Sequence, residues 1–383
     1  MIIIWGCCPQ KTDQIPIQFQ ELENLTVYSA DTKTSTAPSF KKDAVYGDTK
    51  EVLIGKIHDV AVDSLGRVFI ADVPRMALYA FEPDGRFITQ LGSEGRGPGE
   101  FSVLNSLKVH VNRLYAYDPS QYRIHIFTLN DLTGEKTVHL AENRSRYPAI
   151  AKSMPWISEV YVRNDGTYIA KFLVEDKSPA LKQWQNFDVR GLLYLLNNNG
   201  FISRELLEFT SEIRTRIPIQ KALMDSSIKP FFGNAQVVIS SNNSIYLAEP
   251  DHFLIKIYSP DGYYERAFYY PVKKIPLTQE SAIDARVVNL YTSNMPSIDL
   301  PETWPVLNDI KIDDKDRLWV ATTMDDMTLH EWWVLEPTGK LITKFEWPRS
   351  KLIEVVRDSY IYTKETDPET SQEKIVRYRI EFE

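Results

Sequence analysis

The chain repeats one pattern five times, and this repetition limits the folds open to it more than any other feature. In each copy, a stretch with apolar residues at alternate positions meets a short polar turn, and a second apolar stretch follows. Alternation indicates a strand with one buried face, and the polar turn joins two such strands as a hairpin. The copies begin at Val60, Leu107, Val160, Val237 and Ile310.

Each copy continues into a third strand, a recurring turn and a fourth strand. The turn has the form of Glu82–Gly85 or Ser259–Gly262, with proline early and glycine last. Proline presets a negative φ, and glycine supplies the positive φ that ends such a turn. A four-stranded unit cannot bury both of its faces alone, whereas units packed face to face around an axis can. The sequence therefore predicts an all-β propeller of four-stranded antiparallel blades.

The blade count follows from the end of the chain. Leu352–Phe382 contains three further strand patterns, which make an incomplete sixth blade. An N-terminal strand would complete it and close the ring, and the candidates are Leu25–Ser29 and Glu51–Ile54. Five or seven blades are the alternatives. We expect one domain over residues 25–383, preceded by a tether over residues 1–24. The expected blades lie near residues 57–91, 104–140, 157–210, 234–270, 307–347 and 352–383.

Loops are expected to gather at one end of the ring. The stretch Leu91–Phe101, LGSEGRGPGEF, connects the outer strand of the first blade to the inner strand of the second, and we expect Phe101 to pack between them. Because strands one and two form a hairpin, connectors between blades emerge at the same end as loops between strands two and three. All the long insertions are of these two kinds. They are Ala141–Pro155, Leu173–Arg190, Thr210–Gly233, Pro271–Pro305 and Thr323–Glu331.

This loop-rich face is the candidate binding face, because binding residues concentrate on loops held by a rigid scaffold. Acidic residues precede the first apolar position of some inner strands or end some second strands. They are Asp59, Asp72, Asp118, Glu159, Glu249 and Asp309. Three tryptophans, Trp156, Trp184 and Trp304, lie in the same loops, and an aromatic face beside carboxylates can hold sugars or peptides. The alternative is structural: the acids cap turns, and each tryptophan packs its own loop.

Catalysis by a metal centre is the second hypothesis. His58 and His252 are the histidines placed on the loop-rich face, His330 is a weaker candidate, and His110 and His125 are assigned to the framework. Asp59, Glu159 and Asp309 offer oxygen ligands, the kind that Ca²⁺ prefers. Motifs of serine hydrolases, zinc proteases and P-loop enzymes are absent from the sequence.

Both cysteines, Cys7 and Cys8, lie at the start of the chain, in MIIIWGCC. This stretch resembles the end of a bacterial lipoprotein signal, with Cys7 as the lipidated residue. It predicts an exported protein held at the cell envelope by a lipid; the alternative is a cytoplasmic protein. The formal net charge is −8, and no run of lysine or arginine occurs, which argues against a nucleic-acid partner. Contact with a membrane is expected only through the anchor.

The repeats resemble a known group of proteins. The core D-x-x-G-R followed by apolar residues, the P-D-G turn and the connector GRGPGEF are similar to NHL-type repeats. They resemble most closely the six-bladed propeller lipoproteins common in Bacteroidetes and related bacteria. The resemblance implies the fold and says little of activity, because NHL-type proteins include binding scaffolds and a few metal-dependent lyases and lactonases. We expect non-catalytic binding of a carbohydrate, peptide or partner protein. The alternative is a metal-assisted hydrolase or lyase.

Overall fold

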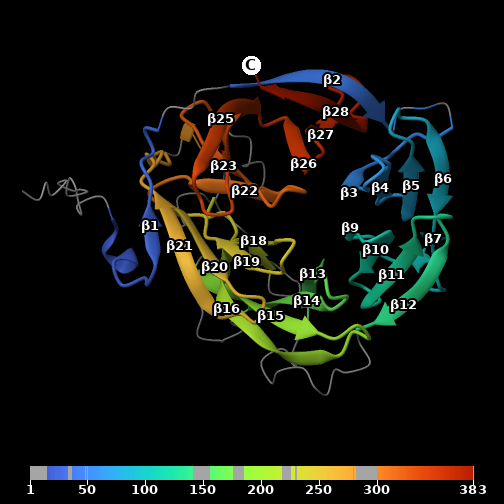
Figure 1. Cartoon of the computed structure of the whole chain (residues 1–383), viewed down its shortest axis with the longest axis horizontal. Helices are drawn as coiled ribbons and strands as arrows, with labels where there is room; N and C mark the ends of the chain where they lie inside the picture. The colour runs from blue at the N-terminus through green and yellow to red at the C-terminus, as the bar shows by residue number, and fades with distance from the viewer. Residues whose placement is uncertain are drawn as a thin grey trace, which may run out of the picture.

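The structure is a computed structural model of the whole chain. It describes residues 15–32, 37–47, 49, 51–140, 156–175, 185–217, 226–228, 231–278, 280–281 and 300–382. Within this part of the chain, six sheets surround a central axis (Figure 1). The expectation of an all-β six-bladed propeller is confirmed, with the innermost strand of each blade beside the axis.

The six blades follow one another around the ring in chain order. Blade 1 contains β3 (Ile57–Val62), β4 (Val68–Asp72), β5 (Ala77–Phe81) and β6 (Phe87–Leu91). Blade 2 contains β9 (Ser106–His110), β10 (Arg113–Asp118), β11 (Arg123–Thr128) and β12 (Gly134–His139). Blade 3 contains β13 (Trp156–Val162), β14 (Tyr168–Glu175), β15 (Asn186–Leu196), β16 (Ile202–Ile217) and β17 (Ser226–Ile228).

Blade 4 contains β18 (Gln236–Ile239), β19 (Ile245–Ala248), β20 (Phe253–Tyr258), β21 (Tyr264–Tyr270) and β1 (Leu25–Val27). Blade 5 contains β22 (Leu307–Ile312), β23 (Leu318–Thr323), β24 (Leu329–Leu335) and β25 (Leu341–Pro348). Blade 6 contains β26 (Lys351–Arg357), β27 (Tyr360–Thr366), β28 (Glu373–Phe382) and β2 (Pro38–Tyr46). The described chain also contains the short parallel pair β7 (Ser93–Glu94) and β8 (Glu100–Phe101), and a 3₁₀ turn at Ile17–Phe19.

Two blades have five strands, where the sequence predicted four. The outer strand of blade 3 pairs with β17 in antiparallel fashion, whereas that of blade 4 pairs with β1 in parallel. Parts of the expected insertions are also strand, because β16 runs to Ile217 and β24 begins at Leu329. The repeat pattern could not show this extension, since these residues pair outside the part of the blade that the copies share.

The ring closes through an N-terminal strand, but neither candidate strand performs this role. β2 pairs with β28 from Pro38↔Phe382 to Tyr46↔Ile375 and completes blade 6 (Figure 1). The candidate Leu25–Ser29 instead supplies β1 of blade 4, and Glu51–Ile54 lies in the connector that leads to β3. Two lysines and an aspartate interrupt the apolar alternation of β2, which explains why the pattern did not reveal it.

The chain packs on the ring before residue 25, the expected start of the domain. Phe19 is buried against Leu254 and Tyr269 of blade 4, and its ring meets the His252 ring edge to face. Part of the expected tether over residues 1–24 is therefore an ordered layer over the outer strands of this blade.

Apolar side chains fill the spaces between blades. Phe101 is fully buried in a cluster that joins Phe69 and Leu78 of blade 1 to Leu114 and Phe127 of blade 2. This confirms that the glycine-rich connector delivers a phenylalanine between two blades. The position of the Phe101 ring also explains why residue 92 is a glycine, because a Cβ at Gly92 (φ +68°) would overlap that ring.

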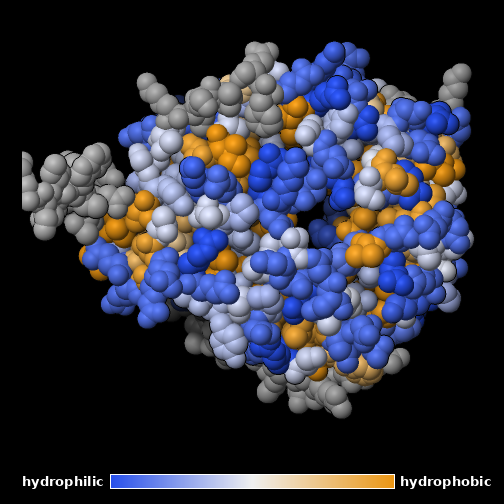
Figure 2. Space-filling model, in the orientation of Figure 1, coloured by the Kyte–Doolittle hydropathy of each residue, from blue (hydrophilic) through white to orange (hydrophobic). Residues whose placement is uncertain are grey.

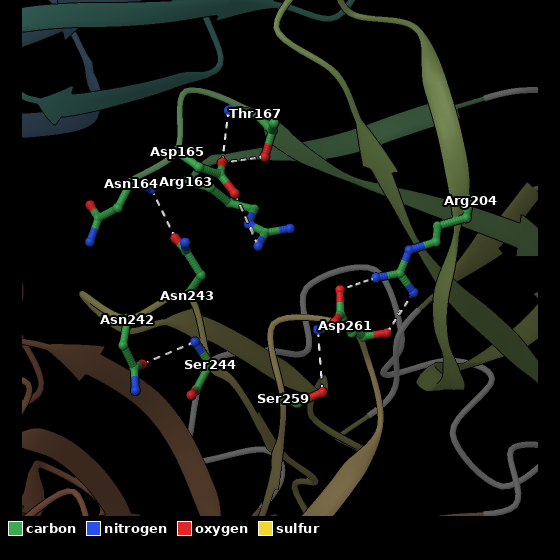
Figure 3. Close-up of polar contacts among 10 residues, drawn as sticks. All are labelled: Arg163, Asn164, Asp165, Thr167, Arg204, Asn242, Asn243, Ser244, Ser259 and Asp261. Atoms are coloured by element: carbon green, nitrogen blue, oxygen red, sulfur yellow. Dashed lines mark hydrogen bonds and ion pairs between the residues drawn. The ribbon is translucent and has the colours of Figure 1, made fainter.

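Tight turns form the end of the ring opposite the loop-rich face, and we call this end the turn face. Neighbouring turns bond directly to one another there (Figure 3). The Asn164 amide of blade 3 donates to Asn243 Oδ1 of blade 4 at 2.8 Å, and Arg204 pairs with Asp261 across the same two blades. These bonds hold adjacent blades together at the turns.

Replacement of Gly85 by alanine should destabilise the ring more than replacement of Gly166. Both glycines end turns with positive φ, +91° and +78°, so both substitutions carry the same type of backbone strain, about 1 kcal/mol. A Cβ at Gly85 would also overlap the Val45 carbonyl oxygen of the closing strand, whereas nothing lies within 4 Å of a Cβ at Gly166. We expect urea denaturation to show an additional loss of about 1–3 kcal/mol for Gly85→Ala. Equal losses would show that β2 does not contact this turn.

Candidate functional site

A cavity of about 470 Å³ runs along the axis of the ring. The innermost strands of all six blades line it, and we call it the channel. Figure 2 shows it as a hollow at the centre of the ring. Its volume lies in the range of small-molecule sites. Because the lining includes the beginnings of the inner strands, the channel reaches the loop-rich face that the sequence predicted as the binding face.

Irregular pairing directs three acidic side chains into the channel. The register shifts between Ile57 and Asp59 in blade 1, and the corresponding shifts precede Glu159 in blade 3 and Asp309 in blade 5. An extra residue in one strand of a pair changes the direction of the side chains that follow it. Asp59, Glu159 and Asp309 all line the channel, so the structure places these predicted residues around one lumen.

Asp59 joins the first two blades. Its two carboxylate oxygens accept hydrogen bonds from the Val60 amide at 2.8 Å and from the Leu107 amide of blade 2 at 2.7 Å. Each oxygen therefore has a backbone donor, and the carboxylate joins the inner strands β3 and β9. The side chain still lines the channel, where its charge acts on the lumen.

Glu159 belongs to a charged group within blade 3. Its Oε1 lies 3.3 Å from Lys171 Nζ, and its Oε2 accepts a hydrogen bond from the Tyr161 hydroxyl. Burial acts to raise the pKa of Glu159, but the ammonium of Lys171 and the hydroxyl of Tyr161 lower it overall. The carboxylate is therefore ionised, and 45% of its side chain is exposed to the lumen.

Asp309 belongs to a second charged group, formed by blades 5 and 6. Its Oδ2 lies 3.0 Å from Lys311 Nζ, and Glu354 Oε1 lies 3.4 Å from Lys364 Nζ. Burial acts to lower the pKa of Lys311, but Asp309 and Glu354 raise it overall. Burial raises the pKa of Glu354, and the ammonium of Lys311 opposes that rise. Asp309 and Glu354 thus each lie beside an ammonium group of their own blade.

The channel wall contains lysines as well as the predicted acids. Three of the acids that line the channel, Glu159, Asp309 and Glu354, pair with the ammonium groups of Lys171, Lys311 and Lys364. Lys108 and Lys311 line the channel themselves, whereas Lys171 and Lys364 reach its acids from second strands. Alternation along a strand could have revealed Lys311, because residues two apart share a face. The repeat pattern already places Lys171 at this end of its blade, as the last residue of the predicted second strand, whereas it does not single out Lys364.

The other predicted acids lie away from the channel lining. Asp72 is fully buried and accepts hydrogen bonds from the amides of Gly55 and Lys56. Asp118 is likewise buried and holds the connector into blade 2. Glu249 pairs with Lys256 Nζ at 2.8 Å. At Asp72 and Asp118 the capping alternative describes the structure, because each carboxylate satisfies amides of the connector into its own blade.

Among the described residues, the predicted tryptophans do not form an aromatic surface that faces the channel. Trp304 is buried, and its ring packs edge to face on Phe231 with centroids 5.4 Å apart. It therefore packs loops together, as the alternative proposed, and does not face the lumen. Trp184 lies outside the described residues, and Trp156 begins β13 with its side chain outside the described part. Within the described part of the channel wall, the aromatic side chains are those of Tyr161 and His110.

The histidine candidates do not converge. His58 Nε2 lies 2.8 Å from Asn105 Oδ1, and Asn105 also donates to the Ser158 carbonyl, so this group links blades 1, 2 and 3 near the channel. His252 packs on Phe19 at the outer surface, and burial lowers its pKa to about 4. Burial lowers the pKa of His330 to about 3.

The two histidines assigned to the framework lie in blade 2. His125 is buried at the connector, where its Nδ1 accepts from the Gly99 amide. His110 lines the channel towards the turn face. Among the described residues, no group of three or more histidine, cysteine or acidic side chains could hold a metal ion. Asp59, Glu159 and Asp309 are thus separated around the lumen, each with its own partners.

Comparison with known proteins identifies the architecture. Residues 48–157 match the family model DUF5128, described as a 6-bladed beta-propeller. The six sheets of the structure agree with that description. The chain is a six-bladed β-propeller. The match spans blades 1 and 2 with the connector between them, which is the part of this propeller where the glycine-rich stretch lies.

Two solved structures resemble the propeller over most of its length. One is a protein from Bacteroides fragilis that is predicted to be exported, with a TM-score of 0.53 and 14% identity over 94% of this chain and 100% of that chain. The other is a member of the DUF4221 family from Bacteroides vulgatus, with a TM-score of 0.55 and 8% identity over 92% of this chain and 99% of that chain. At such identities the likeness shows the fold alone.

A short stretch of sequence resembles an enzyme. The mouse peptidyl-glycine alpha-amidating monooxygenase is 43% identical over 77 residues. These residues make up 18% of this chain and 8% of the mouse protein, so the chain spans less than a tenth of its length. Within the described part of the propeller, no helix has the length and apolar character needed to cross a membrane.

Proposed function

We propose that this propeller is an exported, non-catalytic binding protein that takes a small polar ligand into the channel from the loop-rich face. The observation that carries the proposal is the set of charged side chains of both signs around a cavity of about 470 Å³. Such a wall offers hydrogen bonds and charges to a hydrophilic molecule. Carbohydrates and peptides both meet this description, as would an extended segment of a partner protein.

The state of the carboxylates favours binding over metal-assisted chemistry. Asp59 accepts two backbone amides, Glu159 has Lys171 and Tyr161, and Asp309 has Lys311. A general base or a metal ligand would need a lone pair available to the reacting group or ion. At Glu159 and Asp309 the ammonium groups of Lys171 and Lys311 occupy that position.

The proposal that the protein is exported rests on one observation from its sequence and one from a protein of similar fold. The N-terminal MIIIWGCC resembles the end of a lipoprotein signal, and the Bacteroides fragilis structure with the same fold comes from a protein predicted to be exported. Cys7 lies outside the described residues. Metabolic labelling of the native host with a palmitate analogue should label the protein, and Cys7→Ser should abolish the label. Unlabelled wild-type protein in the cytoplasmic fraction would contradict export.

Ligand binding can be tested on the purified protein by screening several classes of small molecule. We expect thermal shift screening against amino acids, short peptides and mono- and oligosaccharides to raise the melting temperature for at least one class. A ligand that binds only the folded protein stabilises it by about 2.7 kcal/mol at one hundred times its Kd. Lys311→Met should abolish that shift, because it removes a channel-lining ammonium and leaves Asp309 without its cation. A shift that Lys311→Met leaves unchanged would place the ligand elsewhere.

The screen also tests the enzymatic alternative. Ca²⁺ and Zn²⁺ with EDTA controls belong in the same screen, and we expect no metal to raise the melting temperature. Stabilisation by either metal, lost in Asp309→Asn, would contradict the non-catalytic proposal and favour a metal-assisted hydrolase or lyase.

A further inference from the structure

One ammonium group of the channel has no described partner. Lys108 lies on β9, lines the channel and is exposed to it. The other three lysines of the charged wall each lie within 3.0–3.4 Å of a carboxylate. Within the described residues, the Lys108 ammonium makes neither an ion pair nor a hydrogen bond. It is thus available to an anionic group of a ligand.

Carboxylates flank Lys108 on both sides of the ring. Asp59 of blade 1 accepts the amide of Leu107, the residue before Lys108, so its carboxylate lies at the level of that lysine. Glu159 of blade 3 lies on the other side, where the charge of Lys108 helps to lower its pKa. Since 45% of the Glu159 side chain is exposed to the lumen, it can accept a further donor. Blades 1 to 3 therefore present a carboxylate, an ammonium and a carboxylate in succession.

We propose that the channel binds a zwitterionic ligand, namely a free amino acid or a short peptide, with its carboxylate on Lys108 and its ammonium between Asp59 and Glu159. This inference rests on the proposed function and specifies its ligand class. A neutral sugar has no anionic group to place on the Lys108 ammonium. The described wall also offers a sugar little aromatic surface, because the Tyr161 hydroxyl is bonded to Glu159 and Trp304 packs loops.

The size and electrostatics of the channel agree with this ligand class. A cavity of about 470 Å³ has room for an amino acid or a short peptide. Hydrogen bonds between ionised groups are about twice as strong as those between neutral groups, so losing either terminal charge should be costly. Opposite charges placed side by side also reject molecules that carry only one charge, because one of their contacts then becomes repulsive.

Isothermal titration calorimetry with dialanine and its blocked forms tests the inference. We expect dialanine to bind, and both its N-acetyl and its C-terminal amide forms to bind at least tenfold more weakly. Lys108→Gln should weaken dialanine at least tenfold and leave the amide form unchanged, because the amide has no carboxylate for the lysine to bind. Lys42→Gln, an exposed lysine of the outer strand β2, is the matched control and should bind as the wild type does.

The failures of the two proposals can be told apart. If a disaccharide binds and the binding depends on Lys311 but not on Lys108, the zwitterion inference is wrong and the binding function stands. Equal binding of dialanine and its amide form also overturns the inference, since it shows a site for a cation. If neither peptides nor saccharides bind to the channel, both proposals are wrong. A folded Lys108→Gln protein, shown by an unchanged thermal melt, is required in each case.

Discussion

A chain that lacks residues 1–46 should fail to fold cooperatively, and its thermal melt followed by circular dichroism should show no sigmoidal transition. This truncation removes β2, the outer strand of blade 6, which pairs with β28 over Pro38–Tyr46. Blade 6 would retain three strands, and the unpaired edge of β28 would be open to aggregation. We expect the loss of stability to exceed that caused by removing one outer strand of another blade, because β2 connects the first and last blades of the ring.

The side chains of β2 show why the effect should be large. Tyr46 is fully buried, donates from its hydroxyl to the Pro83 carbonyl of blade 1 at 2.8 Å, and packs against Phe81 and Tyr362. Phe40 packs on Trp347 of blade 5, with ring centroids 4.9 Å apart. Loss of one large buried aromatic side chain costs about 3–5 kcal/mol. Loss of the whole strand should therefore consume most of the roughly 5–15 kcal/mol that stabilises a typical domain.

Controls separate the strand from its surface charges. Lys42→Gln alters an exposed side chain of β2, and its melting temperature should match the wild type, since surface substitutions change stability by about 0.5 kcal/mol or less. Tyr46→Ala should lie between the control and the truncation. A cooperative melt of the truncated chain near the wild-type temperature would show that closure by β2 is dispensable.

Asp118→Ala should be strongly destabilising, with a loss of about 3 kcal/mol or more in urea denaturation. The Asp118 carboxylate is fully buried and accepts hydrogen bonds from the amides of Ser102, Ser120 and Gln121 at 2.7–3.1 Å. Each buried donor left unpaired costs roughly 1–3 kcal/mol. The matched control is Asp84→Ala, because Asp84 caps a turn but is 57% exposed, and its replacement should cost much less than that of Asp118.

The same residue predicts a pH dependence. Burial acts to raise the pKa of Asp118, but the hydrogen bonds from Ser102 and Gln121 lower it overall. A lowered pKa in the folded state means that the unfolded chain takes up the proton first. The contribution is therefore complete above about pH 4, the ordinary aspartate pKa, and is lost as the pH falls through the lower folded pKa. Asp118→Asn should lack this part of the acid destabilisation. If the unfolding free energies of the wild type and of Asp118→Asn fall by the same amount from pH 6 to pH 3, Asp118 does not contribute to the acid destabilisation.

The blades could be predicted from sequence because their information is local. Alternating apolar residues and Pro-Asp-Gly turns specify hairpins within about forty residues, and the structure places each predicted blade where the pattern indicated. The closing strand could not be found in the same way. β2 lies more than 320 residues from its partner β28, and its lysines hide the alternation. Which N-terminal segment reaches that edge depends on how the rest of the ring places it.

The residues of the candidate site likewise fall into those that local sequence predicted and those that only the tertiary structure brought together. Sequence reasoning located Asp59, Glu159 and Asp309 at the starts of inner strands, and they line one channel. It did not single out Lys311 beside Asp309, nor did it foresee the ion pair of Lys171 with Glu159 across the hairpin of β13 and β14. It also placed Trp304 on the binding face, whereas the residue packs against Phe231, a contact between segments 73 residues apart.

By itself, the amino-acid order determined that this protein is built of repeated β-hairpin units, because periodicity and turn chemistry act between near neighbours. Only the three-dimensional arrangement decided which strand seals the ring and what charge the channel carries. Both outcomes depend on side chains that are distant along the chain and meet only once the blades have packed. The electrostatic character of a lumen is the sum over all its walls, and no single stretch of sequence contains it.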